Sequence, residues 1–303
     1  FEEANNPRWN CRIAYSYYFL DDFKNAEKYL LKANKLYPED NFTCTLLIET
    51  YISLSRVEDE NGNHEKAMEY ALEAKKYVRD EEGEANADSF LAWLYDRYGH
   101  YTEAEELLKN MINKSKDDEW LYSELGYCLA EQGRQEEALE SYFKAIELNR
   151  NDAWIFTRIG MCYKNMDKKE EAIEYYLKAL ELKEDDIFIM SDLAWLYDSL
   201  GEFEKALKYL ERLEELGEND AWTNTEYGYC LSKLKRFDEA IVKINRALEA
   251  EDDDKDTAYI YSQLGWCKRH LEKYDEAIKA FSQAKKWGRN DAWINIELGH
   301  CYK

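Results

Sequence analysis

Residues 151–186 read NDAWIFTRIGMCYKNMDKKEEAIEYYLKALELKEDD, and this stretch decides the fold. Apolar residues recur at intervals of three and four residues in both halves, which predicts two amphipathic helices. A short polar segment between the halves predicts a turn. Each helix would carry one apolar stripe, so the two stripes can pack against each other. The stretch is therefore expected to form a helical hairpin.

The same pattern recurs along the chain at a nearly constant period. A small residue in the first helix recurs at intervals of 34, 34, 34, 37 and 34 residues, at Gly126, Gly160, Ala194, Gly228, Gly265 and Gly299. An alanine near the start of the second helix recurs with one matching insertion, at Ala104, Ala138, Ala172, Ala206, Ala240 and Ala277. Both series place an insertion of three residues in the acidic stretch 251–256. Such repeats predict a single elongated array, not two independent domains.

This pattern resembles the tetratricopeptide repeat, whose unit of 34 residues combines small, aromatic and alanine positions in two helices. The resemblance covers essentially the whole chain. It implies an all-α, right-handed superhelical solenoid of about eight antiparallel helix pairs in one domain, residues 1–303. The expected units are residues 7–40, 41–84, 85–118, 119–152, 153–186, 187–220, 221–257 and 258–291, followed by a partial unit at 292–303.

The junctions between units depart from the family pattern. The closing proline of the repeat occurs only as Pro38, and Asp152, Asp220 and Asp291 instead precede an Ala-Trp pair. An aspartate in this place can accept hydrogen bonds from the free N–H groups of the next helix. We expect these residues to cap the helices that follow them.

Three places interrupt the period or end it. About seven extra residues near 56–63 and three near 79–84 are polar and predict extended loops between helices, as does the acidic stretch 251–256. Residues 292–303 predict one helix without its partner, which would expose Ile294, Leu298 and Cys301. That helix either caps the array or belongs to a longer array, and we expect the second. A start at Phe1 without Met also suggests a fragment.

Charge and hydropathy narrow the classes of function. A formal net charge of −23 disfavours nucleic-acid binding, which needs a basic surface. The negative charge favours solubility, and it could also steer basic partners. No apolar run approaches 18 residues, so no membrane span is expected, and no basic–apolar leader marks a signal peptide.

Residues that could carry chemistry show no recognisable arrangement. The seven cysteines lack a CxxC spacing, and most fall at one repeat position, so we expect small buried side chains in a reducing compartment, the cytoplasm. The four histidines are scattered. Asp252, Asp254 and Asp256 have the alternating spacing of a calcium loop, but Thr257 replaces its glycine, so a solvated acidic loop is expected. No catalytic residue, metal or cofactor is predicted, and the chain is not expected to be an enzyme.

Two ladders of mostly aromatic residues are expected on the first helix of each unit. The second residue of the unit is Trp120, Trp154, Phe188, Trp222, Tyr259 or Trp293, and seven residues later stands Tyr127, Met161, Trp195, Tyr229, Trp266 or His300. A separation of seven places both ladders on one face. Between them lie Glu124, Arg158, Asp192, Glu226, Gln263 and Glu297. In tetratricopeptide arrays this face lines the concave groove, so the resemblance implies an aromatic, mostly acidic groove.

The predicted function is a non-catalytic scaffold that binds a protein or peptide, possibly a basic segment. Its predicted groove residues are Trp120, Glu124, Tyr127, Trp154, Asp192, Trp195, Trp222, Glu226, Tyr229, Trp266 and Trp293. Aromatic faces and carboxylates both attract cations. Packing of the tryptophans against the preceding unit is the alternative use of the first ladder. A module that senses a ligand or peptide within a larger protein is the alternative function. The family's carboxylate clamp is not expected, because its Lys, Asn and Arg positions hold other residues.

Overall fold

The computed structural model describes residues 6–250 and 254–302, and all regular structure in this part is helical. The helices are α1 (Pro7–Tyr18), α2 (Phe23–Leu36), α3 (Asn41–Glu60), α4 (His64–Ala74), the short 3-10 turn η2 (Lys75–Tyr77), α5 (Glu81–Arg97), α6 (Tyr101–Lys114), α7 (Glu119–Glu131), α8 (Gln135–Glu147), α9 (Ala153–Asn165), α10 (Lys169–Leu182), α11 (Ile187–Ser199), α12 (Phe203–Glu215), α13 (Ala221–Lys233), α14 (Phe237–Ala250), α15 (Asp254–His270), α16 (Tyr274–Lys286) and α17 (Ala292–Cys301).

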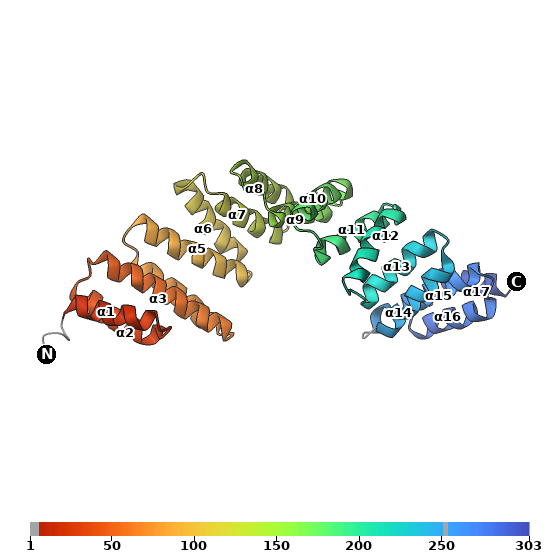
Figure 1. Ribbon diagram of the computed structural model, residues 1–303, viewed down its shortest axis with the longest axis horizontal. Helices are drawn as coiled ribbons and strands as arrows, with labels where there is room; N and C mark the ends of the chain where they lie inside the picture. The colour runs from red at the N-terminus through yellow and green to blue at the C-terminus, as the bar shows by residue number, and fades with distance from the viewer. Residues whose placement is uncertain (1–5, 251–253, 303) are drawn as a thin grey trace. The chain divides into compact units, whose positions relative to one another are not determined.

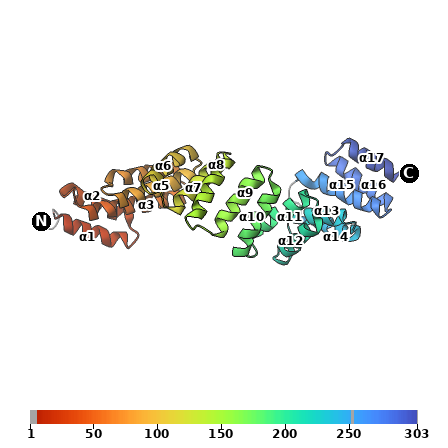
Figure 2. The same ribbon diagram turned by 90° about the horizontal axis from the view of Figure 1, so that it is seen from above.

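Consecutive helices form antiparallel pairs within two compact units, Phe1–Asn151 and Asp152–Lys303. The first unit contains the pairs α1/α2, α3/α4, α5/α6 and α7/α8, and each odd-numbered helix after α1 also contacts the second helix of the pair before it. The second unit repeats this order from α9 to α16, and Figure 2 shows α9 beside α10. The expected fold class, an all-α superhelical solenoid of antiparallel helix pairs, is confirmed.

Small residues let the two helices of a pair approach closely. A Cβ atom built on Gly160 of α9 would lie 2.7 Å from Cδ1 of Tyr176 on α10, which is fully buried. Gly126 meets Tyr142 in the same way, and Gly265 meets Phe281. The large side chain fills the space that a missing Cβ leaves, so each pair packs without a void.

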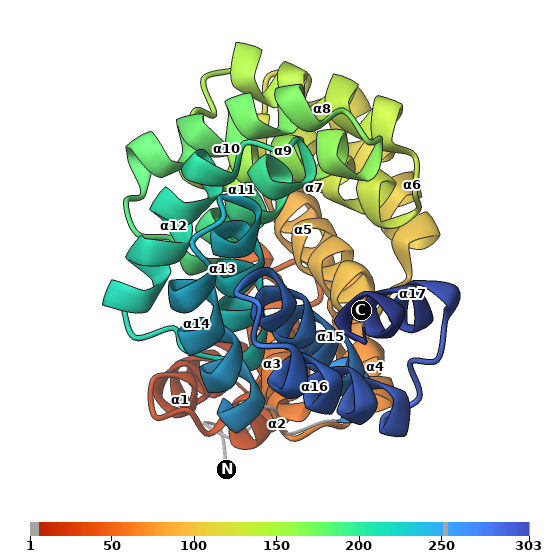
Figure 3. The same cartoon turned by 90° about the vertical axis from the view of Figure 1, so that its right-hand side faces the viewer.

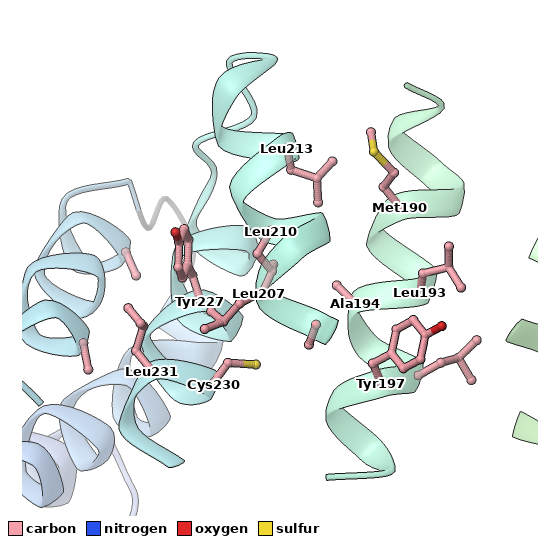
Figure 4. Close-up of a cluster of buried hydrophobic side chains, with 14 of the residues drawn as sticks. Met190, Leu193, Ala194, Tyr197, Leu207, Leu210, Leu213, Tyr227, Cys230 and Leu231 are labelled. Atoms are coloured by element: carbon pink, nitrogen blue, oxygen red, sulfur yellow. The ribbon is translucent and has the colours of Figure 1, made fainter. Parts of the chain in front are cut away.

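Neighbouring pairs share one continuous apolar core in the second unit. In Figure 4, Met190 and Leu193 of α11 lie near Leu210 and Leu213 of α12, and Cys230 of α13 extends the cluster. All seven cysteines are buried and none forms a disulfide, which agrees with the prediction from their repeat position. Burial raises the pKa of the Cys267 thiol to about 12, so this thiol is protonated and packs as a small apolar side chain.

The predicted aspartate caps are confirmed. The carboxylate of Asp152 accepts a hydrogen bond from the backbone N–H of Ile155 at 2.9 Å. Asp220 accepts from Thr223 at 2.7 Å, and Asp291 accepts from Ile294 at 2.9 Å. Each cap pairs one of the N–H groups that a helix start leaves without an intrahelical partner.

The predicted loops at the first two insertions are wrong, because the extra residues lengthen helices. Residues 56–60 form the last turn of α3, which continues until the chain reaches Gly62 at φ 76°. Glu58 and Asp59 in that turn are buried, and Asp59 pairs with Arg97 of α5 at 2.9 Å. Residues 81–84 likewise belong to α5, whose first turn is capped by the Asp80 carboxylate. Polar residues that were expected in solvent therefore serve the packing of α3 against α5.

Two further expectations change near the end of the second unit. Asp254 and Asp256 lie in α15 and not in a loop, whereas Asp252 and the remainder of 251–253 lie outside the described residues. Helix α17 does not expose Ile294 and Cys301, because both are buried in a cluster with Phe281 and Ala284 of α16. Figure 3 shows α17 beside α16. Leu298 is half-buried and packs against the same cluster, so the predicted exposure of this apolar face is wrong.

Candidate functional site

The predicted groove residues of the first unit lie together on α7. Trp120, Glu124 and Tyr127 are all half-buried, whereas Leu121 and Leu125 on the neighbouring side of the helix are buried. The carboxylate of Asp118 caps α7 and fixes the start of this helix. The first-helix face is therefore partly open to solvent and distinct from the core side.

The predicted groove residues of the second unit are also half-buried or exposed. They come from five first helices: Trp154 on α9, Asp192 and Trp195 on α11, Trp222, Glu226 and Tyr229 on α13, Trp266 on α15 and Trp293 on α17. The exposed fraction is 42% for Trp195, 40% for Trp222 and 37% for Trp293. Such large rings are unusual surface residues for a helix that needs only an apolar core stripe.

Three of these rings meet around one pocket. Tyr229, Trp266 and Trp293 line a cavity of about 170 Å³, together with Tyr259 and the amide of Gln263. The pocket joins α13, α15 and α17, so it depends on three successive repeats. The ring centroids of Trp293 and of Phe281 on α16 are 6.0 Å apart, in an edge-to-face arrangement. This tryptophan thus contacts the preceding pair and lines the pocket as well.

Two cations of the chain lie over the rings of this pocket. The Lys233 ammonium is 4.8 Å from the ring centroid of Tyr229 and 5.7 Å from that of Trp266. The Arg289 guanidinium is 5.0 Å from the Trp293 centroid, and it donates a hydrogen bond to the hydroxyl of Ser262. The ring faces of the pocket therefore accept positively charged groups.

Gln263 at the floor of the pocket is poorly satisfied. Its side chain is 8% exposed, and neither Oε1 nor Nε2 has a hydrogen-bond partner of normal length and angle in the described part of the chain. The amide interacts with the Tyr259 hydroxyl outside the usual hydrogen-bond geometry, so its hydrogen bonding is incomplete, which costs free energy. A ligand that both donates and accepts hydrogen bonds would satisfy it.

The three predicted acidic residues have different surroundings. The carboxylate of Asp192 accepts hydrogen bonds from Lys164 Nζ at 2.6 Å and from the Tyr176 hydroxyl at 2.5 Å. Burial, together with the negative charge of Asp198, raises the pKa of Glu226 to about 7. Burial also raises the pKa of Asp198, whose carboxylate accepts a hydrogen bond from Cys230 Sγ at 3.6 Å. Glu124 lies with Asp96 near the Cys128 thiol, whose pKa is raised by burial and by both negative charges. Glu226 and Asp198 form a desolvated acidic pair, whereas Asp192 is neutralised by its neighbours.

A second, wider pocket lies at the first two pairs of the second unit. Trp154, Arg158 and Met161 of α9 line it together with Phe188 of α11, and its volume is about 390 Å³. The Arg158 guanidinium lies 5.2 Å from the Trp154 ring centroid. The same combination of ring and cation thus occurs at both ends of the second unit.

Three charged residues in or near these pockets were not predicted as site residues. Lys233 and Arg289 line the smaller pocket, and Asp198 lies beside Glu226. Only Asp198 has a detectable signal, since it lies three residues after Trp195 on the same helical face. Arg289 occupies the place of the family's closing proline. Its position over two neighbouring first helices follows from the stacking of repeats and not from local sequence.

Two other features, a membrane-spanning helix and a metal site, were searched for in the described residues. No helix among them is long and apolar enough to cross a membrane. No cluster of three or more His, Cys, Asp or Glu side chains in residues 6–250 and 254–302 could hold a metal ion.

Comparison with known families identifies the class of protein. Models described as tetratricopeptide repeat match residues 8–40, 120–152, 153–186, 189–221 and 219–286. The chain belongs to the tetratricopeptide repeat family. Its members are typically non-catalytic scaffolds, and this membership supports a protein-interaction scaffold with protein or peptide partners.

Solved structures show the same fold at low sequence identity. YrrB, a tetratricopeptide repeat protein with an unusual peptide-binding site, is 24% identical over 63% of this chain and 97% of its own, with a TM-score of 0.57. A tetratricopeptide repeat protein from Parabacteroides merdae is 17% identical over 85% and 99%, with a TM-score of 0.56. MamA from Desulfovibrio magneticus is 17% identical over 57% and 97%, with a TM-score of 0.52. A search of curated proteins found no match.

Proposed function

We propose that the first-helix face of this scaffold binds an extended peptide segment with basic side chains. The ring face, as we call it, comprises the eight predicted residues that lie in the second unit together with Asp198, Tyr259 and Gln263. The observation that carries the proposal is the acidic pair Glu226 and Asp198, which lies beside rings that attract cations. An extended peptide could place a lysine or arginine there while its backbone reaches Gln263.

The rings support a cationic partner because cations of the chain itself already use them. The Lys169 ammonium lies 5.8 Å from the ring centroid of Trp195. Lys233 and Arg289 make equivalent contacts with Trp266 and Trp293. A cation over an aromatic face gains about 0.5–2 kcal/mol, depending on desolvation. Several such contacts along one groove would add up to specific binding.

The acidic pair supports the same choice of partner. Glu226 is desolvated and lies near the carboxylate of Asp198. Burial and the repulsion between the two carboxylates keep Glu226 partly protonated near neutral pH. A bound cation would relieve the repulsion and would favour the ionised form of both groups. Binding of a basic peptide should therefore release a proton from Glu226.

Fluorescence anisotropy with three labelled peptides of equal length tests the proposal. The peptides share a Gly/Ser/Tyr backbone and carry Lys, Gln or Glu at the same positions. We expect the Lys peptide to bind most tightly, and to bind more tightly at about pH 8 than at about pH 6, because Glu226 ionises between these values while lysine keeps its charge. The Glu226→Gln variant should lose most of the difference between the two pH values.

Glu181→Gln is the matched control, because Glu181 is an exposed glutamate on the second helix α10. This variant should bind the Lys peptide as the parent chain does at both pH values. Equal affinity for the Lys, Gln and Glu peptides would show that charge does not select the partner. Binding that survives Glu226→Gln with its full pH dependence would show that another group titrates.

A further inference from the structure

The pocket around Gln263 has the opposite charge from the chain as a whole. Two positively charged side chains, Lys233 and Arg289, line this pocket, and none of the described residues that line it is acidic. The chain, by contrast, has a formal net charge of −23. Two cations beside one small pocket suit a ligand that carries a negatively charged group, because such a group accepts charge-assisted hydrogen bonds.

Flat aromatic faces surround the same pocket. The Arg289 guanidinium lies 5.0 Å from the ring centroid of Trp293 and 5.7 Å from that of Tyr259. The Lys233 ammonium lies 5.7 Å from the ring centroid of Trp266. Because Lys233 is exposed and has a flexible stem, its ammonium can leave the ring when a ligand enters. A flat ligand could then stack on the ring that the cation covers now.

The amide of Gln263 adds a requirement for hydrogen bonds. This side chain is more than nine-tenths buried, and its contact with the Tyr259 hydroxyl does not have the usual hydrogen-bond geometry. The amide offers an acceptor, Oε1, beside a donor, Nε2. The edge of a purine base offers a donor beside an acceptor, and glutamine pairs with adenine through two hydrogen bonds in this way. Such a base would complete the hydrogen bonding of the amide.

We propose that this pocket binds a purine nucleotide. The base stacks on the rings and pairs with Gln263, while Lys233 and Arg289 hold the phosphate. Arg289 also pairs with Asp291 at 3.1 Å, but a guanidinium has five N–H donors and can serve both groups. A carboxamide side chain of a peptide would pair with Gln263 but would leave the rings uncovered, so the purine accounts for more of the pocket. The inference goes beyond the proposed peptide function and does not depend on it.

Isothermal titration calorimetry at low salt tests the proposal with three ligands and no peptide. The ligands are AMP, adenosine, and adenosine that carries two methyl groups on its exocyclic amine. We expect AMP to bind saturably and more tightly than adenosine, which lacks the phosphate. The dimethylated nucleoside keeps the purine ring but has no N–H donor at the paired edge, so it should bind more weakly than adenosine. Lys233→Gln should reduce the difference between AMP and adenosine.

Gln263→Leu is the decisive variant, because it removes the amide and keeps the pocket apolar. It should weaken AMP binding about tenfold through the loss of two hydrogen bonds. Its thermal midpoint should not fall, since an apolar side chain replaces a buried amide whose hydrogen bonding is incomplete. Gln283→Leu is the matched control, because Gln283 is an exposed glutamine on α16, and it should leave AMP binding unchanged.

A second pair of variants tests the stacking. Trp266→Leu should weaken AMP binding about tenfold or more, because stacking of a base on an aromatic ring is lost. Trp287→Leu is its control, since Trp287 is 41% exposed and does not line the pocket. No saturable binding of AMP, or binding that Gln263→Leu leaves unchanged, would overturn the proposal. Equal affinity for adenosine and its dimethylated form would overturn the pairing with Gln263, and AMP that binds no more tightly than adenosine would overturn the phosphate contact.

Discussion

Gly160 and Tyr176 are so close that a methyl group on the glycine must displace the ring. Gly160→Ala should lower the free energy of unfolding by about 1–3 kcal/mol, because the ring is fully buried and cannot move into solvent. Gly299→Ala is the matched control, since its methyl group meets nothing and alanine favours a helix by about 1 kcal/mol over glycine. Urea denaturation of both variants measures the difference. An equal change in the two variants would mean that the close contact with Tyr176 adds nothing to the backbone effect of the substitution.

For single residues, the sequence predicts the roles of those whose contacts lie within one helix or one helix pair. The glycine positions and the caps at Asp152, Asp220 and Asp291 follow from a repeating pattern and from helix chemistry, and the structure agrees. The neutralisation of Asp192 does not follow in this way, because its partner Lys164 is on a different repeat. Contacts between repeats depend on how helices cross, and the spacing within one repeat does not determine that.

The long helix α3 illustrates the limit of the pattern at the scale of an element. Its last turn was expected to be a loop because residues 56–60 are polar and interrupt the period. No glycine or proline occurs within residues 56–60, and the buried Asp59 gains two partners, Arg97 at 2.9 Å and the Tyr98 hydroxyl at 2.8 Å. Polar residues thus extend a helix where a neighbouring helix supplies their hydrogen bonds.

Asp59→Ala should therefore loosen the end of α3 without unfolding the remaining helices. The variant removes the acceptor of one ion pair and one hydrogen bond at a buried place, which should cost about 1–3 kcal/mol locally. Hydrogen–deuterium exchange should become faster in residues 56–60 and at the end of α5. Glu60→Ala, at an exposed position in the same turn, should leave the exchange unchanged. Unchanged exchange in Asp59→Ala would mean that the turn is held by backbone hydrogen bonds alone.

For the whole molecule, the repeated period determines the order of packing, whereas the charge is not part of that period. Within each unit, a helix pair packs on the next because the same apolar positions recur, so the fold class could be predicted from the sequence. The charge of the predicted acidic groove could not be predicted from the repeated period, because lysines and arginines from other helices lie among its carboxylates and rings. The formal net charge of −23 nevertheless means that carboxylates are in excess. These carboxylates repel one another and attract cations over a longer range.

This net charge predicts opposite effects of salt on stability and on peptide binding. Raising NaCl screens repulsion among the excess carboxylates, and the exposed ion pairs in the described part of the chain contribute little, so the thermal midpoint should rise. The same screening should weaken binding of the Lys peptide, whereas the Gln peptide should be nearly insensitive. Thermal unfolding and fluorescence anisotropy over one series of salt concentrations measure both effects. A midpoint that falls with salt would mean that the exposed ion pairs outweigh the repulsion, and unchanged affinity for the Lys peptide would remove charge attraction from the binding mechanism.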